Sequence, residues 1–346
     1  MFQYKKLLSA LSLTVLGSLS VASAQSILGL PTLGEIERLD PRLDALIPAD
    51  AKIEVLASGF DWAEGPVWIA DDGGALLFSD LPNNVIHRWH PRRGLEVYLK
   101  PAGFTGIGEY SSESGSNGLT LDTDGNLVAC EHGDRRISVL VKDGGKRTLV
   151  DNYQGKRLNS PNDLVYHSSG ALYFTDPPYG LPERGSDPTR ELDYAGVYRL
   201  SPGGELTLLT AELTRPNGIA FSPDERTLYV AVSDPEHAVI MAYDVLEDGL
   251  VDAGRVFFDA TSRVGAMPGL PDGLKGDANG NLFATGPGGV LVFAPDGAHL
   301  GTIKPGHATA NCGWGGDGTV LYMTSESYLC RIQLTTRAAG WPAAPE

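Results

Sequence analysis

The sequence predicts an all-β fold, namely a six-bladed β-propeller with a metal site at its centre. Three observations lead to this prediction: a hairpin pattern that recurs six times, a lack of sustained helical periodicity, and an oxygen-bearing residue at one fixed point of every repeat. The 346 residues include 43 Gly and 23 Pro, which interrupt nearly every stretch that could otherwise form a long helix.

Each repeat has a short alternating or apolar strand, a turn centred on Asp, Ser, Asn or Gly, and a second strand rich in β-branched or aromatic residues. This order is typical of a β-hairpin, and Gly125, Gly170 and Gly280 can supply the positive φ that tight turns require. The six copies are GPVWIADDGGALLFS from Gly65, GLTLDTDGNLVAC from Gly118, DLVYHSSGALYFT from Asp163, GIAFSPDERTLYVA from Gly218, GLKGDANGNLFAT from Gly273 and CGWGGDGTVLYMT from Cys312.

The spacing of the copies predicts one four-stranded sheet per repeat. Successive copies begin 39 to 55 residues apart, and further short strands are expected between them. Six such sheets arranged in a ring leave only short, protected edges. The segment 53–57 precedes the first copy and is expected to close the ring by adding an outer strand to the last sheet.

The N-terminus has the pattern of a secretory signal. Two lysines precede an apolar run, Leu7 to Val21, and small residues follow as far as Ala24. That run is too short to span a bilayer, so we expect a periplasmic or secreted protein without a membrane anchor. The expected division is a signal peptide (1–24), an N-terminal extension (25–50) and the propeller (51–346).

Negative charge dominates the composition, with a formal net charge of −16. Nucleic acids and anionic membranes require a basic surface, so neither is an expected partner. Cys130, Cys312 and Cys330 are too few to staple a fold, and three packed thiols are favoured over a Cys312–Cys330 disulfide. The sequence does not define an oligomeric state.

An oxygen-bearing side chain directly precedes the first strand of every copy. In a propeller the innermost strands begin on one face beside the central channel, so these residues should meet around its mouth. We call this set the oxygen ring: Glu64, Asn117, Asn162, Asn217, Asp272 and Asn311.

The chemistry of the oxygen ring favours a hard cation. Two carboxylates and four amides, without His or Cys, suit Ca²⁺, and another divalent cation such as Mg²⁺ or Zn²⁺ is the alternative, although Zn²⁺ prefers nitrogen and sulfur. For any one position the plainer explanation is a turn, because Asn and Asp side chains bond the nearby backbone. Six such residues in register favour a shared site.

Other candidate contacts lie where the second strands return to the same face. His132 and Asp176 are predicted to bind substrate, with a hydrogen-bonded rim histidine and a turn-stabilising aspartate as the alternatives. The long segments 103–116 and 178–194 are expected to set specificity. The tryptophans Trp62 and Trp68 are expected to pack between blades.

Several motifs resemble those of the calcium-dependent gluconolactonase and senescence-marker-protein family. They are EGPVW (64–68), SPNDL (160–164), RPNGIAFS (215–222) and LPDGLKGD (270–277). The resemblance covers nearly all of the chain after residue 24 and implies a six-bladed propeller with a divalent metal in its channel. The metal ligands that it implies are Glu64, Asn217 and Asp272, with Asn162 contacting the metal or the substrate. Asn117 and Asn311 are the ring residues expected to contact substrate or form the rim, because a metal need not touch all six.

The resemblance implies a metal-dependent carboxylic ester hydrolase that converts a sugar lactone, such as glucono-1,5-lactone, to the aldonic acid. The cation would polarise the carbonyl or a water, and Asp272 is expected to be the catalytic residue that takes a proton from that water. The sequence leaves open whether a separate base is needed. The alternatives are an arylesterase or phosphotriesterase on the same metal, and a non-catalytic ligand-binding propeller.

Overall fold

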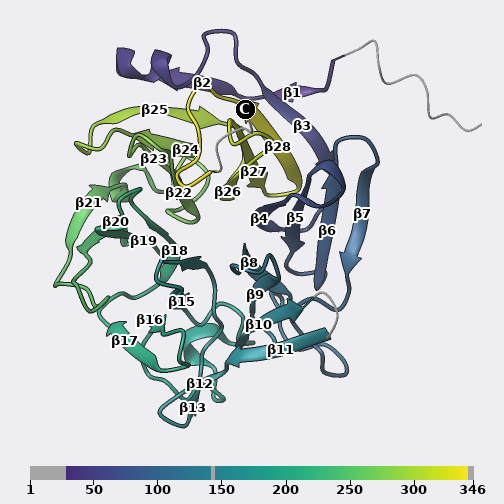
Figure 1. Cartoon of the computed structure of the whole chain (residues 1–346), viewed down its shortest axis with the longest axis vertical. Helices are drawn as coiled ribbons and strands as arrows, with labels where there is room; N and C mark the ends of the chain where they lie inside the picture. The colour runs from purple at the N-terminus through teal and green to yellow at the C-terminus, as the bar shows by residue number, and fades with distance from the viewer. Residues whose placement is uncertain (1–28, 142–144, 342–346) are drawn as a thin grey trace, which may run out of the picture. The chain divides into compact units, whose positions relative to one another are not determined.

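The computed structural model of the chain describes residues 29–141 and 145–341. The predicted signal peptide, 1–24, lies outside the described residues. From Pro31 onward the strands form six sheets arranged in a ring, which confirms the six-bladed β-propeller (Figure 1). No helix in the described part of the chain is long and apolar enough to cross a membrane.

The first three blades are regular four-stranded antiparallel sheets. Blade one contains β4 (Ala63–Ile69), β5 (Ala75–Asp80), β6 (Val85–His90) and β7 (Gly94–Leu99). Blade two contains β8 (Ser116–Leu121), β9 (Leu127–Glu131), β10 (Arg136–Val141) and β11 (Gly145–Val150). Blade three contains β14 (Leu164–Tyr166), β15 (Leu172–Asp176), β16 (Gly196–Leu200) and β17 (Leu206–Thr210).

The last three blades follow the same order, and two of them gain extra strands. Blade four contains β18 (Pro216–Phe221), β19 (Thr227–Asp234), β20 (His237–Asp244) and β21 (Arg255–Asp259). Blade five contains β22 (Leu274–Gly276), β23 (Leu282–Gly286), β24 (Gly289–Phe293), β25 (His299–Lys304) and β2 (Glu35–Arg38). Blade six contains β26 (Thr309–Gly315), β27 (Val320–Ser325), β28 (Tyr328–Gln333), β3 (Ile53–Ser58) and β1 (Thr32–Leu33).

Short elements connect the blades. A two-stranded hairpin follows blade two, and the helical segments among the described residues are single 3₁₀ turns. These elements are β12 (Asn152–Tyr153), β13 (Lys156–Arg157), η1 (Pro41–Ala45), η2 (Asp71–Gly73), η3 (Arg184–Ser186) and η4 (Thr261–Arg263).

The N-terminal part of the propeller closes the ring. β3 pairs with β28, so the predicted closure by the segment 53–57 is confirmed. Residues 32–38 also add edge strands, because β1 pairs with β3 and β2 pairs with β25. The first and last segments of the propeller are therefore held together by backbone hydrogen bonds rather than by side-chain packing alone.

Buried aromatic and aliphatic side chains fill the wedges between adjacent blades. Trp68 of β4 stacks on Tyr322 of β27 with ring centroids 5.6 Å apart, which joins blade one to blade six as expected for this tryptophan. Phe174 stacks on Tyr198 at 5.3 Å within blade three, against Val128 of blade two. The core is thus a series of packed blade interfaces.

The innermost strands approach one another so closely that a side chain does not fit between them. At Gly65 a Cβ atom would lie 2.2 Å from the carbonyl oxygen of Asn117, and at Gly218 it would lie 2.1 Å from that of Asp272. Each glycine directly follows an oxygen-ring residue. The recurring Asn-Gly, Asp-Gly and Glu-Gly pairs therefore combine a polar side chain with a point of backbone contact between blades.

All three cysteines are buried and free, in agreement with the prediction of packed thiols. The alternative Cys312–Cys330 disulfide is wrong. Cys312 and Cys330 lie on β26 and β28, and Met323 of β27 pairs with both. Two strand spacings, roughly 9 to 10 Å, exceed the Cα separation that a disulfide can bridge.

We predict that Gly218→Ala destabilises the protein by about 1–3 kcal/mol, because the new methyl group meets backbone that cannot move away without shifting a blade. Thermal unfolding followed by circular dichroism would measure the loss. The matched control is Gly203→Ala, whose added Cβ meets nothing closer than Ser201 Oγ at 3.7 Å, with an expected change within about 0.5 kcal/mol. Equal effects of the two substitutions would contradict the close-approach argument.

Candidate active site

The oxygen ring lies where the innermost strands begin, and β-bulges shape several of these positions. Between Glu64 and Val67, three residue steps on β4 oppose two on β5. The same irregularity occurs between Ser116 and Leu119 of β8 and between Pro216 and Ile219 of β18. A bulge leaves an extra residue out of the ladder and re-aims a side chain, which here frees the ring side chains from the sheet.

Hydroxyl groups on the second strands fix the backbone around the ring. Each of four hydroxyls donates to a carbonyl oxygen at or beside the ring residue of the next blade. The bonds run from Ser79 to Asn117 (2.9 Å), Thr175 to Asn217 (2.6 Å), Ser233 to Pro271 (2.5 Å) and Thr285 to Ala310 (3.1 Å). This hydroxyl belt anchors the main chain of the ring and leaves its side-chain oxygens available.

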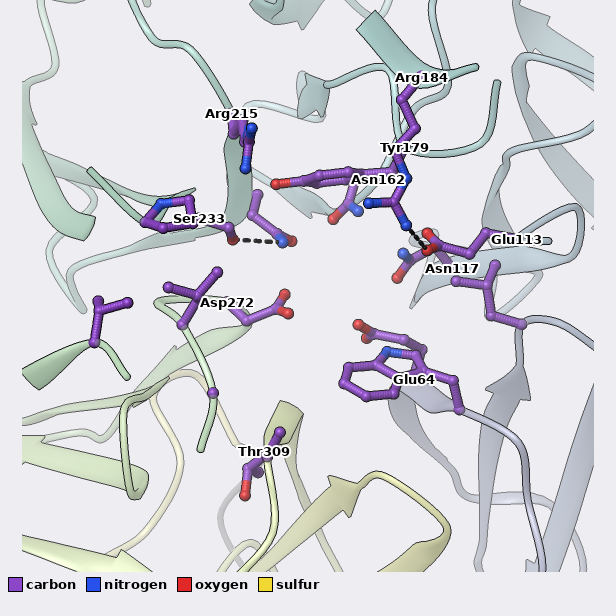
Figure 2. Close-up of a pocket in the computed structure, with 18 of the residues that line it drawn as sticks. Glu64, Glu113, Asn117, Asn162, Tyr179, Arg184, Arg215, Ser233, Asp272 and Thr309 are labelled. Carbon is purple, nitrogen blue, oxygen red and sulfur yellow. Dashed lines mark hydrogen bonds and ion pairs between the residues drawn. The ribbon is translucent and has the colours of Figure 1, made fainter. Parts of the chain in front are cut away.

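Five of the six ring residues line one cavity of about 470 Å³, a size typical of small-molecule sites. They are Glu64, Asn117, Asn162, Asn217 and Asp272. The carboxylates of Glu64 and Asp272 point toward each other across its floor (Figure 2). The positions predicted from the repeat are thus brought together, with Asn311 as the exception.

Asn311 does not line the cavity but lies behind Glu64. Its amide nitrogen donates to Glu64 Oε2 at 3.3 Å, and its amide oxygen accepts from the backbone N–H of Cys312 at 2.9 Å. With both ends engaged, Asn311 orients a carboxylate instead of facing a substrate. The sequence predicted that Asn311 contacts the substrate, whereas in the structure it contacts Glu64 and lies outside the cavity wall.

The amide nitrogens of two ring asparagines are turned away from the cavity. Asn217 Nδ2 donates to Ser233 Oγ at 2.8 Å, and Asn117 Nδ2 lies 3.4 Å from His132 Nε2. Within the described chain, the oxygens of both amides and Oδ1 of Asp272 are buried without a hydrogen-bond partner. Buried acceptors of this kind are costly unless a ligand satisfies them, and convergent oxygens fit a hard cation.

The buried carboxylates of Glu64, Asp163 and Asp272 repel one another. Burial raises the pKa of Glu64 to about 8, and the nearby Asp163 adds to the effect. Burial and then Glu64 and Asp163 raise the pKa of Asp272 well above its usual range. Among the described residues, no group of three or more His, Cys, Asp or Glu could hold a metal ion, so a cation here would depend on asparagine oxygens.

His132 is fully buried and does not line the cavity, contrary to the predicted substrate contact. Burial lowers its pKa to about 4, so the ring is neutral at physiological pH. Its Nδ1 lies 3.1 Å from the carbonyl oxygen of Glu113. A proton on Nδ1 satisfies this contact and leaves Nε2 to accept from Asn117, so His132 orients that amide.

Asp176 is also fully buried and absent from the cavity wall. It accepts a 2.8 Å hydrogen bond from the backbone N–H of Asn159, in the segment that leads to Asn162. Burial raises the pKa of Asp176 to about 7. Its position matches the turn-stabilising alternative more closely than substrate binding.

The cavity includes residues for which the repeat gave no signal. Glu113 and Arg184 come from the two long segments and form an ion pair of 2.9 Å at the mouth (Figure 2). Trp62 lines the cavity rather than a blade interface, so its predicted packing role is wrong. Because Trp62 lies two residues before Glu64 and outside the hairpin pattern, the repeat did not identify it. Arg215 is the first residue of the RPNGIAFS motif, and its position two residues before Asn217 is the signal that could have identified it.

Comparisons with known proteins agree with this architecture. The model of the SMP-30/gluconolactonase/LRE-like region matches residues 62–327. A gluconolactonase from Zymomonas mobilis is 41% identical to this chain over 342 residues. The matched region covers 95% of this chain and 94% of the gluconolactonase.

Solved structures include close structural relatives. A gluconolactonase from Xanthomonas campestris has a TM-score of 0.77 at 34% identity, covering 88% of this chain and 96% of that one. A calcium-binding protein, regucalcin, from Agrobacterium tumefaciens has a TM-score of 0.65 at 21% identity, covering 84% and 97% respectively, and shares the fold.

We predict that the protein in chelator loses stability as pH rises from about 5 to 8. The folded state retains protons that the unfolded chain releases, because the pKa of Glu64 is raised from 4.5 to about 8. Excess Ca²⁺ should raise the melting temperature more at pH 8 than at pH 5, and Glu64→Gln should reduce this difference without abolishing it, because burial still raises the pKa of Asp272. Differential scanning calorimetry tests it, and a calcium effect that is equal at both pH values would contradict it.

Proposed function

The chain belongs to the SMP-30/gluconolactonase/LRE-like family, and from this membership we propose that it is a divalent-metal-dependent lactonase acting on a sugar lactone such as glucono-1,5-lactone. Its similarity to gluconolactonases supports a lactone hydrolase. The observation that carries the metal dependence is the pair of buried, unpartnered oxygens of Asn217 and Asp272 on one cavity, next to the carboxylate of Glu64.

The proposed ligands of the cation are Glu64, Asn162, Asn217 and Asp272. A bound Ca²⁺ would balance the two carboxylates and polarise the lactone carbonyl. The calcium-binding regucalcin that shares this fold supports the choice of metal. Asn117 is left to orient the substrate, since its oxygen faces the cavity while its nitrogen is held beside His132.

Asp272 is the proposed proton acceptor. Its Oδ1 faces the cavity without a hydrogen-bond partner, so a water can be held against it. As the water oxygen bonds to the carbonyl carbon, Asp272 takes one of its protons. The ring C–O bond then breaks, and the proton passes to the released ring oxygen, which gives the hydroxy acid.

The nonpolar part of the cavity wall supports a compact, partly dehydrated substrate. Trp62, Met267 and Leu270 line the cavity together with the polar groups. Such a wall packs against the carbon skeleton of a sugar lactone and keeps bulk water away from the reacting carbonyl. The same nonpolar wall can also pack against the aryl group of an aryl ester or an aryl phosphotriester, so both classes of compound should be included in the substrate tests.

We further propose that the protein acts outside the cytoplasm after removal of residues 1–24. The support is the pattern of lysines, apolar run and small residues in the sequence. Intact mass of the protein recovered from the periplasm or the medium is expected to correspond to a chain that starts at Gln25. A full-length chain found only in the cytoplasm would contradict export.

We predict calcium-dependent hydrolysis of aldonolactones, measured by pH-stat, that is abolished by chelator and restored by added Ca²⁺. Asp272→Asn should lower kcat by about 10²-fold or more, because the amide cannot accept the proton. Calcium affinity of the variant, measured by calorimetry, separates loss of the proton acceptor from loss of the metal.

The matched control is Asp244→Asn, which removes a carboxylate that pairs with Arg255 on the exposed outer part of blade four and should leave kcat within twofold. Hydrolysis of aryl esters or phosphotriesters but not of lactones would assign the site to the alternative reaction. An absence of chelator-sensitive hydrolysis with every substrate would favour a binding protein.

A further inference from the structure

Arg215 is a cationic side chain of the cavity without a charge partner. It stands just before β18, and Figure 2 shows it pointing toward the cavity. Arg215 is exposed, and the described residues offer its guanidinium no hydrogen bond or ion pair. By contrast, Arg184, on the other side of the mouth, is held by Glu113 at 2.9 Å.

Asp234, at the end of β19, is a carboxylate whose charge interacts with Arg215 without forming an ion pair. Arg215 contributes to lowering the pKa of Asp234, after hydrogen bonds from Thr214 and Glu236. Asp234 accepts those bonds at 2.7 and 3.1 Å and does not line the cavity. Its oxygens are thus engaged at the rim, and the guanidinium of Arg215 keeps its donors for another group.

Tyr179 supplies a second unused donor beside Arg215. Its hydroxyl is buried and makes no hydrogen bond among the described residues. The neighbouring Ser233, which lowers the pKa of Tyr179, already accepts from Asn217 and donates to the carbonyl oxygen of Pro271. Figure 2 shows this hydroxyl pointing to the side of the cavity where Arg215 lies. Burial, followed by Asp272, raises the pKa of Tyr179, so the hydroxyl keeps its proton and can donate.

The formal charges of the cavity favour an anion at this position. In the proposed function a divalent cation balances Glu64 and Asp272, and Arg184 balances Glu113. Among the residues that line the cavity, Arg215 then leaves an excess of one positive charge, while Lys275 offsets the buried Asp163, which does not line it. A planar guanidinium with a neighbouring hydroxyl matches the geometry of a carboxylate or phosphate, which can accept two N–H bonds and one O–H bond.

We propose that Arg215 and Tyr179 form a subsite for an anionic oxygen group, a carboxylate or a phosphate, carried by the lactone substrate. This inference rests on the proposed lactonase function and narrows its substrate class to acidic sugar lactones. The anionic group binds at Arg215, while the carbonyl to be hydrolysed lies between Glu64 and Asp272.

The test compares kcat/KM for three aldonolactones of similar size: one neutral, one carrying a carboxylate and one carrying a phosphate at the far end of the chain. Calcium-loaded wild-type protein should favour at least one anionic lactone over the neutral one by tenfold or more. Arg215→Gln should reduce this preference at least tenfold, Arg215→Lys should retain part of it, and Tyr179→Phe should reduce it by a smaller factor. The preferred anion identifies carboxylate or phosphate as the group bound.

The matched control is Arg255→Gln, which removes an exposed arginine on β21 that pairs with Asp244 and should leave the preference unchanged. A preference that persists in Arg215→Gln, or a wild-type protein that favours the neutral lactone, would overturn the subsite while leaving the lactonase function intact. Lack of activity on all three lactones would instead overturn the function on which the subsite rests.

Discussion

The close contact of six innermost strands is the constraint on which the rest of the structure depends. The inner strands of neighbouring blades touch all around the ring, from β4 through β8, β14, β18 and β22 to β26 and back to β4. Glycines such as Gly65 and Gly218 permit the approach, and the hydroxyl belt fixes it by donating from one blade to the main chain of the next. The side chains at the starts of these strands therefore have no room between neighbouring sheets, and they point toward the channel mouth.

That convergence places groups together that repel or lack partners. In addition to burial, Glu64 raises the pKa of Asp272, and Asp163 raises the pKa of both. Asp163 occupies the position that glycine takes in four other blades and is a third buried carboxylate. Nothing in folding alone favours such a cluster, since an uncompensated buried charge is costly. The packed blade interfaces and the pairing of β3 with β28 supply stability that offsets the cost of this buried carboxylate cluster.

The sequence predicted the parts of the site that follow from repetition. Each ring residue stands at the same point of its hairpin repeat, so counting repeats identified Glu64, Asn217 and Asp272 without any knowledge of their contacts. Counting could not tell which side chains turn inward, because a bulge or a neighbour decides that: Asn311 is held against Glu64, and His132 against Asn117. It also could not place Glu113, whose partner Arg184 lies 71 positions away in an unrelated loop.

The distinction between ring and loops separates the two tasks of the site. Residues proposed to hold the cation belong to strand starts fixed by the hydroxyl belt, and a change there disturbs the contact between blades. Glu113, Tyr179 and Arg184 belong to loops that no blade interface requires, so they can change without cost to the ring. Arg215 stands between these classes, two residues before Asn217 and with its backbone oxygen bonded to Ser233 N at 3.0 Å. Its main chain is therefore fixed next to Asn217, while its guanidinium is exposed and unpaired. An anion that enters the cavity can bind Arg215 without breaking an existing ion pair, whereas Arg184 at the mouth is already paired with Glu113.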